Sequence, residues 1–406
     1  MNENKSDSTF VNKNRILILG GGLFQVPIIK LAKKQGFAVI VTDFNTNPPG
    51  RQYADFFVQM DIKDKVKNLS VAQKFQVNAV LCDQTDVGVQ TAAWISEKLE
   101  LKGIGFETSK VFTDKYLMRS KLKKSDIPSP EFALVNSLDE AKKFLEKTGY
   151  PIVLKPLASQ SSRGVFVVSN ESELQNKFPL TLHESYDGKL LAEKFIDGIE
   201  YTVESYVFND RIFTLAISDK IHYPDNPCVA RRLTYPPELN PSLLKKLVSY
   251  NEQVIKELNL PFGITHAEFK ISDGNPHLIE IAARGGGTYI SSLIIPEVSG
   301  FPVNEYLLNI LVNKNPGEYP EIEHNAANLE FLEFPEGTVT NIEGIDEAKK
   351  ISGVKEIHLD FEIGSKISSP HDDRSRPAFI IVTGKTRKDV LEISERVKAT
   401  IKVSVQ

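Results

Sequence analysis

The sequence has few cysteines, no long apolar run and little excess charge, and each of these absences excludes a class of protein. Its two cysteines, Cys82 and Cys228, cannot build a disulfide framework, which fits a reducing environment. No apolar stretch reaches the roughly 20 residues of a membrane-spanning helix, and the polar residues 1–14 lack the apolar core of a signal peptide. We therefore expect a cytoplasmic protein with no membrane partner, in which residues 1–14 form a frayed tail.

The net charge and the absence of several motifs exclude further functions. A net charge of −4 over 406 residues predicts no nucleic-acid partner. There is no recognisable Ser-His-Asp or Cys-His arrangement for a protein nucleophile, and the GxxxxGK[ST] spacing of a Walker A loop is absent. A chain of this length is too long for one compact core, so we expect about two to three domains.

The first hundred residues read as a parallel α/β domain. An apolar strand at 15–19 runs into three glycines at 20–22, then a helical stretch, a second strand at 38–42 and Asp43. Gln25 stands where a dinucleotide-binding turn would carry its third glycine, so a substrate-facing turn is the stronger interpretation. Asp86 follows a later strand, either at the ligand-binding edge of the sheet or as a helix N-cap.

A hairpin near residue 270 carries two acidic residues. Strands at 265–271 and 277–282 flank a polar turn, and symmetric pairing places Glu268 opposite Glu280. Two facing carboxylates destabilise a hairpin unless a positive charge lies between them, and Mg²⁺ held with substrate phosphates would provide it. An exposed hairpin with a solvated polar face is the alternative. Alternation also predicts that Leu278, Glu280 and Ala282 share a face.

Two lysines precede segments suited to phosphate binding. Lys115 lies in the first turn of a helix capped by Asp114, where a nearby anion would offset the unfavourable helix dipole. Lys155 ends an apolar strand and is followed by a small, polar loop at 158–165 that can lay N–H groups and hydroxyls over phosphate oxygens. A flexible hairpin loop is the alternative.

Further acceptors and donors flank these segments. Glu193 and Glu200 stand either side of a bend at Gly198, where they would suit the amino group of an adenine and the hydroxyls of a ribose; two exposed glutamates are the alternative. Arg231 and the following arginine lie in a proline-rich stretch at 227–237, predicted to be a loop that holds a substrate carboxylate or is merely solvated.

In this order, the motifs resemble the ATP-grasp superfamily: Asp114-Lys115, Lys155, residues 161–164, Glu193-x6-Glu200 and Glu268-x11-Glu280-x3-Arg284. HAEFK followed by IEIAARGGG is most similar to the L-amino-acid ligase and carboxylate–amine ligase branch. The N-terminal half is similar to the purine-pathway carboxylating ATPase and to carbamoyl phosphate synthetase. The resemblance implies an α/β fold with a Rossmann-like domain at 1–112, ATP-grasp subdomains at 113–190 and 191–315, and a C-terminal lobe at 316–406.

The resemblance also implies a set of ATP-binding residues from four motifs: Lys115, Lys155, Ser161, Ser162, Gly164, Glu193, Phe195, Ile196 and Glu200. Within this set the lysines touch phosphates, residues 161–164 form the lid loop, Glu193 accepts from adenine and Glu200 takes the ribose. Backbone at Phe195 or Ile196 reads the ring edge.

The remaining implied residues concern metal, catalysis and substrate. Glu268 and Glu280 would hold Mg²⁺ or Mn²⁺, while Arg284 and Lys155 would stabilise the transferring phosphoryl group. Many family members carry Asn two residues after the second glutamate, where this chain has Ala282, so the number of metal ions is left open. Substrate contacts are assigned to four residues: Arg231, His266, Gly286 and Gly287.

Three functions follow from the resemblance. The first is an ADP-forming ligase that joins a small carboxylate and an amine through an acyl phosphate, with His266 or Asp86 as candidate base and a homodimer expected. The second is a bicarbonate-activating carboxylating ATPase, and the third a catalytically silent nucleotide-binding regulator, which Ala282 alone favours. A full carbamoyl phosphate synthetase is excluded by size, and a biotin-dependent carboxylase is disfavoured because the chain has no Met-Lys-Met biotinylation stretch.

Overall fold

A computed structural model describes residues 13–125, 127–159, 161–316 and 321–406, so most of the expected N-terminal tail lies outside the described residues. The N-terminal domain is a four-stranded parallel sheet in the order β3-β2-β1-β4, as the glycine turn and apolar strands predict. Its elements are β1 Arg15–Leu19, α1 Val26–Lys34, β2 Ala38–Asp43, β3 Phe56–Gln59, α2 Lys65–Lys74, β4 Ala79–Leu81, α3 Val89–Lys98 and α4 Phe106–Val111.

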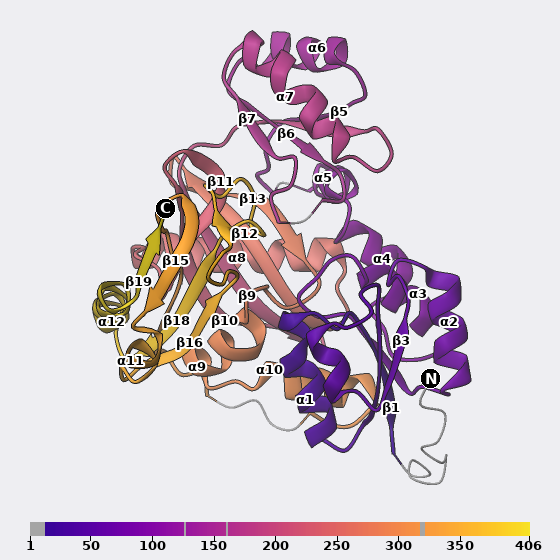
Figure 1. Ribbon diagram of the computed structural model, residues 1–406. Coiled ribbons are helices and arrows are strands. Elements are labelled where there is room, and N and C mark those ends of the chain that lie inside the picture. Colours follow the sequence, from indigo (N-terminus) through magenta and orange to yellow (C-terminus); the bar gives the residue numbers. More distant parts are fainter. Residues whose placement is uncertain (1–12, 126, 160, 317–320) are drawn as a thin grey trace.

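Helix α5 (Lys115–Leu122) leads into a small subdomain that stands apart at the top of Figure 1 and is called the lid subdomain below. Its sheet is antiparallel in the order β5-β8-β6-β7. Its elements are β5 Phe132–Val135, α6 Leu138–Thr148, β6 Ile152–Pro156, β7 Phe166–Val168, α7 Glu171–His183 and β8 Leu190–Lys194. Because β8 pairs with β5 and β6, this sheet extends past the expected boundary at residue 190, to Lys194.

The rest of the chain is built on one eight-stranded sheet, ordered β13-β12-β9-β10-β11-β14-β18-β16. Five of its strands precede residue 315 and three follow it, so the expected C-terminal lobe continues the sheet that holds the acidic hairpin. The strands are β9 Ile199–Phe208, β10 Arg211–Tyr223, β11 Asn226–Tyr235, β12 Gly263–Ser272, β13 Asn275–Ala282, β14 Ala326–Phe331, β16 Val354–Leu359 and β18 Ala378–Gly384.

Helices and a small second sheet cover this large sheet. The remaining strands form the order β17-β15-β19. The covering elements are α8 Pro241–Leu258, α9 Ile295–Ser299, α10 Val303–Leu311, β15 Gly337–Glu343, α11 Ile345–Lys349, β17 Lys366–Ile367, α12 Arg387–Thr400 and β19 Lys402–Val405.

Two local expectations are wrong. The proline-rich stretch expected to be a loop is strand β11, which accommodates Pro227 because it stands at the strand's second residue, before the ladder to β14 begins at Arg232. In the hairpin, Glu268 does face Glu280, but a bulge follows and pairs Phe269 with Leu278. Leu278 is therefore fully buried in the core while Glu280 opens on a cleft, so the two do not share a face.

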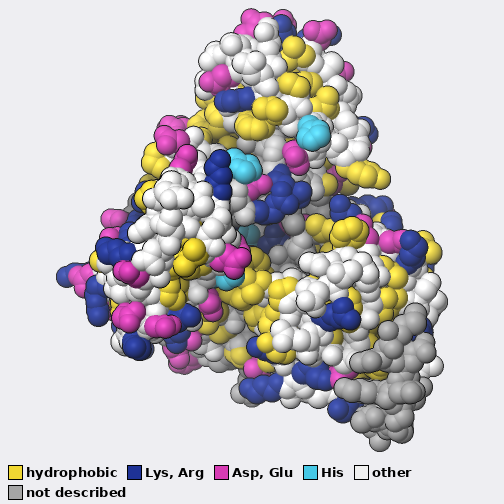
Figure 2. Space-filling model, in the orientation of Figure 1, with side chains coloured by type: hydrophobic (Ala, Val, Ile, Leu, Met, Phe, Trp, Pro, Cys, Tyr) yellow, Lys and Arg dark blue, Asp and Glu magenta, His cyan; other side chains and the backbone are white. Residues whose placement is uncertain are grey.

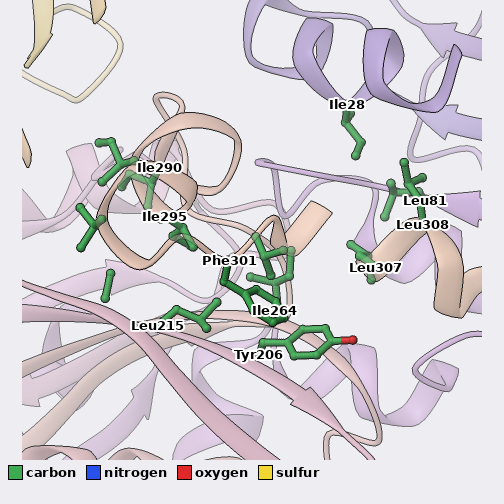
Figure 3. Close-up of a cluster of buried hydrophobic side chains, with 14 of the residues drawn as sticks. Ile28, Leu81, Tyr206, Leu215, Ile264, Ile290, Ile295, Phe301, Leu307 and Leu308 are labelled. Atoms are coloured by element: carbon green, nitrogen blue, oxygen red, sulfur yellow. The ribbon is translucent and has the colours of Figure 1, made fainter. Parts of the chain in front are cut away.

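A single hydrophobic cluster joins the N-terminal domain, the large sheet and the C-terminal lobe (Figure 3). It includes Ile28 and Leu81 from the first domain, Leu215 and Ile264 from the sheet, and Phe379 from β18. The lid subdomain has a separate core around Val135, Leu154 and Val168. The molecule therefore consists of one large packed body and one small body, with a cleft between them.

Candidate functional site

The cleft lies between the lid subdomain and the large sheet and has a volume of about 790 Å³, open to solvent. Figure 2 shows lysine and arginine side chains gathered in the hollow beneath the lid subdomain. Most of the residues expected to bind ATP and metal line this one cleft: Lys115, Lys155, Ser161, Ser162, Glu193, Phe195, Ile196, Glu200, Glu268 and Glu280. Residues separated by up to 165 positions along the chain, from Lys115 to Glu280, are thus brought together by the fold.

A buried ion triad holds Lys155 at one wall. Lys155 Nζ lies 2.5 Å from Glu193 Oε2, and Arg119 Nε donates to Glu193 Oε1 at 2.6 Å. Burial lowers the pKa of Lys155, although Glu193 attracts its charge. Burial opposes ionisation of Glu193 too, but Arg119 and Lys155 hold its pKa below the usual range. Both oxygens of Glu193 are therefore occupied by cations of the chain, and its expected role as an adenine acceptor remains a prediction.

Helix α5 presents Lys115 to the same cleft, next to the segment that follows Lys155. Asp114 caps the helix by accepting from the N–H of Leu117 at 2.9 Å, as the sequence predicts. Lys115 Nζ then contacts Glu280 Oε1 at 2.8 Å and donates to the carbonyl of Ser159 at 2.7 Å. The cation in the first helical turn is thus offset by a carboxylate and a carbonyl.

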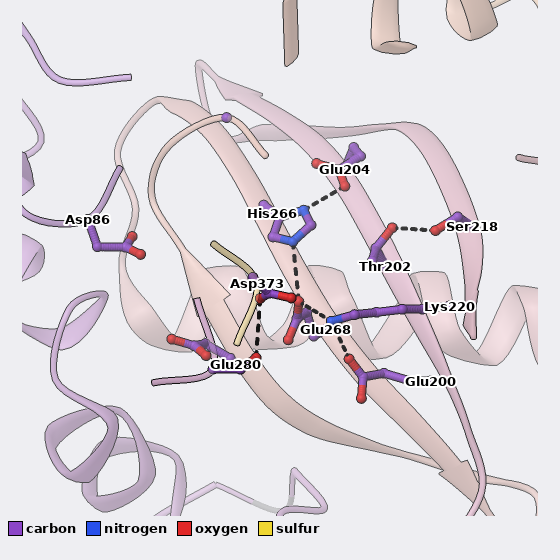
Figure 4. Close-up of polar contacts among 12 residues, drawn as sticks. Asp86, Glu200, Thr202, Glu204, Ser218, Lys220, His266, Glu268, Glu280 and Asp373 are labelled. Carbon is purple, nitrogen blue, oxygen red and sulfur yellow. Dashed lines mark hydrogen bonds and ion pairs between the residues drawn. The ribbon is translucent and has the colours of Figure 1, made fainter. Parts of the chain in front are cut away.

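Glu200 and Glu268 share the ammonium of Lys220, whose Nζ lies 2.7 Å from an oxygen of each (Figure 4). The three residues come from neighbouring strands, with Lys220 directly opposite Glu200. Burial opposes ionisation of both carboxyls. Lys220 and His222 nevertheless lower the pKa of Glu200 to about 2, and Lys220 and His266 lower the pKa of Glu268. Both carboxylates are therefore anionic at neutral pH.

The residues present fit a hard divalent cation. Glu268 and Glu280 face each other across β12 and β13, and both open on the cleft. Among the residues that the structure describes, no group of three or more His, Cys, Asp and Glu can hold a metal by itself. Mg²⁺ nevertheless often takes only one or two carboxylates and completes its shell with phosphate oxygens and water. The pair therefore suits a metal that arrives with a nucleotide.

His266 lies beside this pair and is held by Glu204, its neighbour on β9. Its Nδ1 is 2.6 Å from Glu204 Oε1, and its Nε2 is 3.5 Å from Glu268 Oε1. Burial opposes the charged form of the ring, but the two carboxylates raise the pKa of His266 to about 9. At neutral pH the ring is an imidazolium, which donates protons and does not accept one from an amine. Gly286 packs against it, because a Cβ there would lie 3.0 Å from Nδ1.

Arg284 faces the N-terminal domain. Its Nε and NH2 donate to the two oxygens of Asp86 at 2.9 and 2.8 Å, a bidentate pair. Asp86 is therefore not the N-cap of α3, whose cap is Gly88 with no side-chain bond. Arg284 lines a second, mostly apolar cavity of about 520 Å³ with Asp83 and Gly285. The bidentate pair joins the strand-end loop after β4 to the segment expected to stabilise phosphoryl transfer.

The other expected substrate residues are dispersed. Arg231 lies on β11 with its guanidinium 3.3 Å from Glu333, and it is not among the residues that line the cleft. At Gly287 a Cβ would meet no atom within 4 Å. In the glycine turn of the first domain, Gly21 donates its N–H to Asp43 at 2.7 Å, which removes one donor that a dinucleotide would need.

Sequence reasoning missed Lys220 and Arg119. Lys220 shares its strand parity with Ser218 and His222, and extending the strand past Ser218 would have placed it on the cleft face. Arg119 lies four residues after Lys115 on α5, so it is on the same helix face. Glu204 was also missed; it is fully buried, and only the sheet register places it beside His266.

Comparisons with known protein families agree with this geometry. Residues 148–292 match the ATP-grasp domain, and residues 330–406 match the L-amino acid ligase C-terminal domain 2. The chain therefore contains an ATP-grasp domain. Its second matched domain is of the kind named for L-amino acid ligases.

Individual relatives of this chain are distant in sequence. An uncharacterized protein, y4rH, of Sinorhizobium fredii is 24% identical over 78% of this chain, and the match spans 66%, just under two thirds, of that relative. The L-arginine-specific L-amino acid ligase of Bacillus subtilis is 22% identical over 86% of this chain and 87% of its own length.

Solved structures show the same fold over nearly the whole chain. The L-amino acid ligase of Bacillus licheniformis superposes with a TM-score of 0.82 at 22% identity, covering 97% of this chain and 99% of that one. The phosphoribosylglycinamide synthetase of Anaerococcus prevotii superposes with a TM-score of 0.76 at 21% identity, covering 97% of this chain and 100% of that one.

No helix in the described ranges is long and apolar enough to cross a membrane.

Proposed function

We propose that this chain is an ADP-forming carboxylate–amine ligase of the amino-acid ligase type, acting through an acyl phosphate. The observation that carries the proposal is the convergence of Lys115, Lys155 and Lys220 with the pair Glu268 and Glu280 in one cleft. Such a set suits a nucleoside triphosphate with its metal, since phosphoryl transfer needs positioning and positive charge rather than a protein nucleophile. The match of residues 330–406 to an amino-acid ligase domain supports the choice of reaction.

The chemistry follows from the poor leaving group of a carboxylate. In the first step a carboxylate oxygen attacks the γ-phosphorus, the bond to the β–γ bridging oxygen breaks, and ADP leaves. In the second step an amine attacks the acyl carbon, the carbon–oxygen bond to phosphate breaks, and the amine loses a proton. In this scheme Lys155 and Lys220 neutralise the phosphates and Arg284, held by Asp86, stabilises the transferring group.

Glu268 and Glu280 would hold Mg²⁺ or Mn²⁺, which when bound adds positive charge at the phosphates. Their two cations in this structure, Lys220 and Lys115, are the groups that neutralise the pair without a metal. The lid subdomain would exclude water from the acyl phosphate. Because His266 is an imidazolium at neutral pH, the proton that the amine loses would pass to Asp86, which is held by Arg284, or to the phosphate released in the same step.

The test is ADP release with Mg²⁺ and ATP across amino acids, other carboxylates and bicarbonate. We expect turnover that needs a carboxylate and an amine together, and a loss of about 100-fold or more in Glu280→Gln, which keeps the shape and removes the charge. Glu131→Gln is the matched control, since among the described residues the Glu131 carboxylate pairs only with exposed Lys147, at 3.0 Å. Stimulation by bicarbonate alone would replace this proposal with the carboxylating ATPase. ATP binding without turnover on any substrate would favour the silent regulator.

A further inference from the structure

The C-terminal lobe reaches the cleft through one turn, residues 371–376, which leads into β18. Ser162 Oγ donates to Asp373 Oδ2 at 3.2 Å, across 211 positions of the chain. The backbone N–H of Asp373 donates to the carbonyl of Ser161 at 3.2 Å. Ser161 and Ser162 line the cleft, so this turn touches the loop at 161–164 that was expected to cover the phosphates. The sequence alone suggested nothing more than a charged turn here.

Asp373 is held rigidly on its own side. The guanidinium of Arg376 pairs with Asp373 Oδ1 at 2.8 Å and its Nε donates to the Asp373 carbonyl at 2.8 Å. Arg376 in turn donates to the carbonyl of Ala230 at 3.0 Å and lies over the ring of Phe331, with its Cζ 3.3 Å from the centroid. The carboxylate of Asp372 closes the turn by accepting from the backbone N–H groups of Arg374 and Ser375. Asp373 is thus fixed to the large sheet before it meets the loop.

The other side of the contact is strained. Ser161 and Ser162 both have left-handed backbone conformations, with φ of 61° and 58°. Two consecutive non-glycine residues in this region cost on the order of 1 kcal/mol each, and they persist only where neighbouring contacts hold them. Asp373 supplies two such contacts to these residues, one from its backbone and one from its side chain. The lid subdomain, which carries the loop, has its own separate core.

We propose that Asp373 is a positioning residue that fastens the 161–164 loop over the phosphate end of the cleft, so that the C-terminal lobe completes the ATP site. The inference rests on the proposed function, because it assigns the cleft to ATP. The position of Asp373 supports it: Figure 4 shows Asp373 beside Glu268, the carboxylate expected to hold the metal, and near Lys220. Although burial opposes the charge on Lys220, the attraction of Glu200, Glu268 and Asp373 raises its pKa.

The first test needs no nucleotide and therefore stands apart from the proposed function. Backbone hydrogen exchange is compared in the full-length protein and in Asp373→Ala, Ser162→Ala and Arg374→Ala. We expect exchange of residues 161–168 to rise about tenfold in the first two variants. Arg374→Ala is the control, because Arg374 is exposed and, within the part of the chain that the structure describes, its side chain pairs only with Asp372. Equal exchange in all four proteins would overturn the inference, whatever the enzyme does.

The second test measures how closely ADP release is coupled to amide formation. A merely structural role for Asp373 would not change this ratio. With ATP, Mg²⁺ and the substrates found above, Asp373→Ala should raise the KM for ATP about tenfold and release ADP in excess of amide product, because water reaches the acyl phosphate. Asp373→Asn keeps an acceptor for Ser162 and should restore most of the coupling. The double variant with Ser162→Ala should be no worse than either single variant, since both remove one contact.

Two outcomes of the second test would count against the inference. Additive losses in the double variant would mean that Ser162 and Asp373 act separately. An Asp373→Asn variant as impaired as Asp373→Ala would mean that charge near Lys220, not the hydrogen bond to the loop, is what matters. Absence of turnover in the wild-type protein would sink the proposed function instead, while the exchange result would still decide whether the contact holds the loop.

Discussion

Glu193 is the residue on which the wall of the cleft depends, because it balances two buried cations. It is 3% exposed, and Arg119 and Lys155 occupy its two oxygens. Replacing two buried ion partners by apolar groups can be neutral, but removing one partner leaves an uncompensated charge in a low dielectric. Loss of this carboxylate should therefore lower the free energy of unfolding far more than loss of an exposed glutamate.

We predict that Glu193→Gln lowers the stability of the lid subdomain by about 3 kcal/mol, because Arg119 and Lys155 lose their common partner. It should also raise the KM for ATP, since Lys155 is no longer held against the cleft wall. Denaturant unfolding followed by hydrogen exchange in β6 and β8 measures the first effect. Glu131→Gln serves again as control and should change stability by less than about 0.5 kcal/mol; equal losses in the two variants would refute the argument.

The buried carboxyl of Asp83 makes the stability of the fold depend on pH. It is 1% exposed, and burial, the largest cause, raises the pKa of its carboxyl to about 6 despite hydrogen bonds from Gln84 and Gly285. A carboxyl whose folded pKa exceeds its unfolded value stabilises the fold below the unfolded value, about 4. That stabilisation is lost as the pH rises through 6.

Asp83→Asn should therefore become more stable relative to the wild type between pH 4 and pH 7, by up to about 3 kcal/mol. The asparagine stays neutral, so it avoids the cost of ionising a buried group. Thermal melting of both proteins across this range measures the difference. A difference that does not change with pH would show that Asp83 does not titrate in this range.

At the scale of elements, helix α5 connects a local sequence signal to the site. Its N-cap orients the first turn, and its successive turns carry Lys115 to Glu280 in the cleft and Arg119 to the buried Glu193. The hairpin of β12 and β13 does the same for the carboxylates, with a bulge that turns Leu278 into the core and leaves Glu280 in the cleft. Ordinary helix and strand rules thus place most of the charged groups.

We predict that Asp114→Ala costs about 1 kcal/mol of stability and raises the KM for ATP, because the frayed first turn no longer holds Lys115. Asn240→Ala is the matched control, since it removes an equivalent cap bond of 2.9 Å from α8, away from the cleft. It should cost a similar amount of stability and leave the KM for ATP unchanged. A parallel rise in KM in both variants would assign the effect to general destabilisation.

At the scale of the whole molecule, the hydrophobic cores divide the chain into two bodies, whereas the sequence motifs predicted four domains. The C-terminal lobe shares both a sheet and a hydrophobic cluster with the rest of the large body, whereas the lid subdomain is packed around its own residues. A small body with a separate core, joined to a large one across a cleft, is the arrangement expected for closure over a ligand.

Leu154→Ala and Leu329→Ala test this division, because both side chains are almost completely buried in different clusters. Each should cost about 2–5 kcal/mol. We expect Leu154→Ala to accelerate hydrogen exchange only within the lid subdomain, and Leu329→Ala to accelerate it in the N-terminal domain and C-terminal lobe together. Acceleration of the large body by Leu154→Ala would mean that the two bodies unfold as one.

The sequence by itself determined the local features: the glycine turn of the parallel domain, the cap at Asp114, the lysine near the end of β6 and the facing pair Glu268 and Glu280. These depend on residue types within a few positions, or on a hairpin that its own turn closes, so local rules suffice. The resemblance of these motifs to the ATP-grasp superfamily then implied a set of ATP-binding residues, and most of these residues line one cleft.

Only the tertiary structure decided which charges neutralise which. Lys220 lies between Glu200 and Glu268, and Asp86 holds Arg284, because strand order and domain packing juxtapose them. The contact of Asp373 with Ser162 likewise depends on a sheet that runs into the C-terminal lobe. Such pairings depend on contacts between residues far apart in the chain, which neither propensity nor spacing encodes.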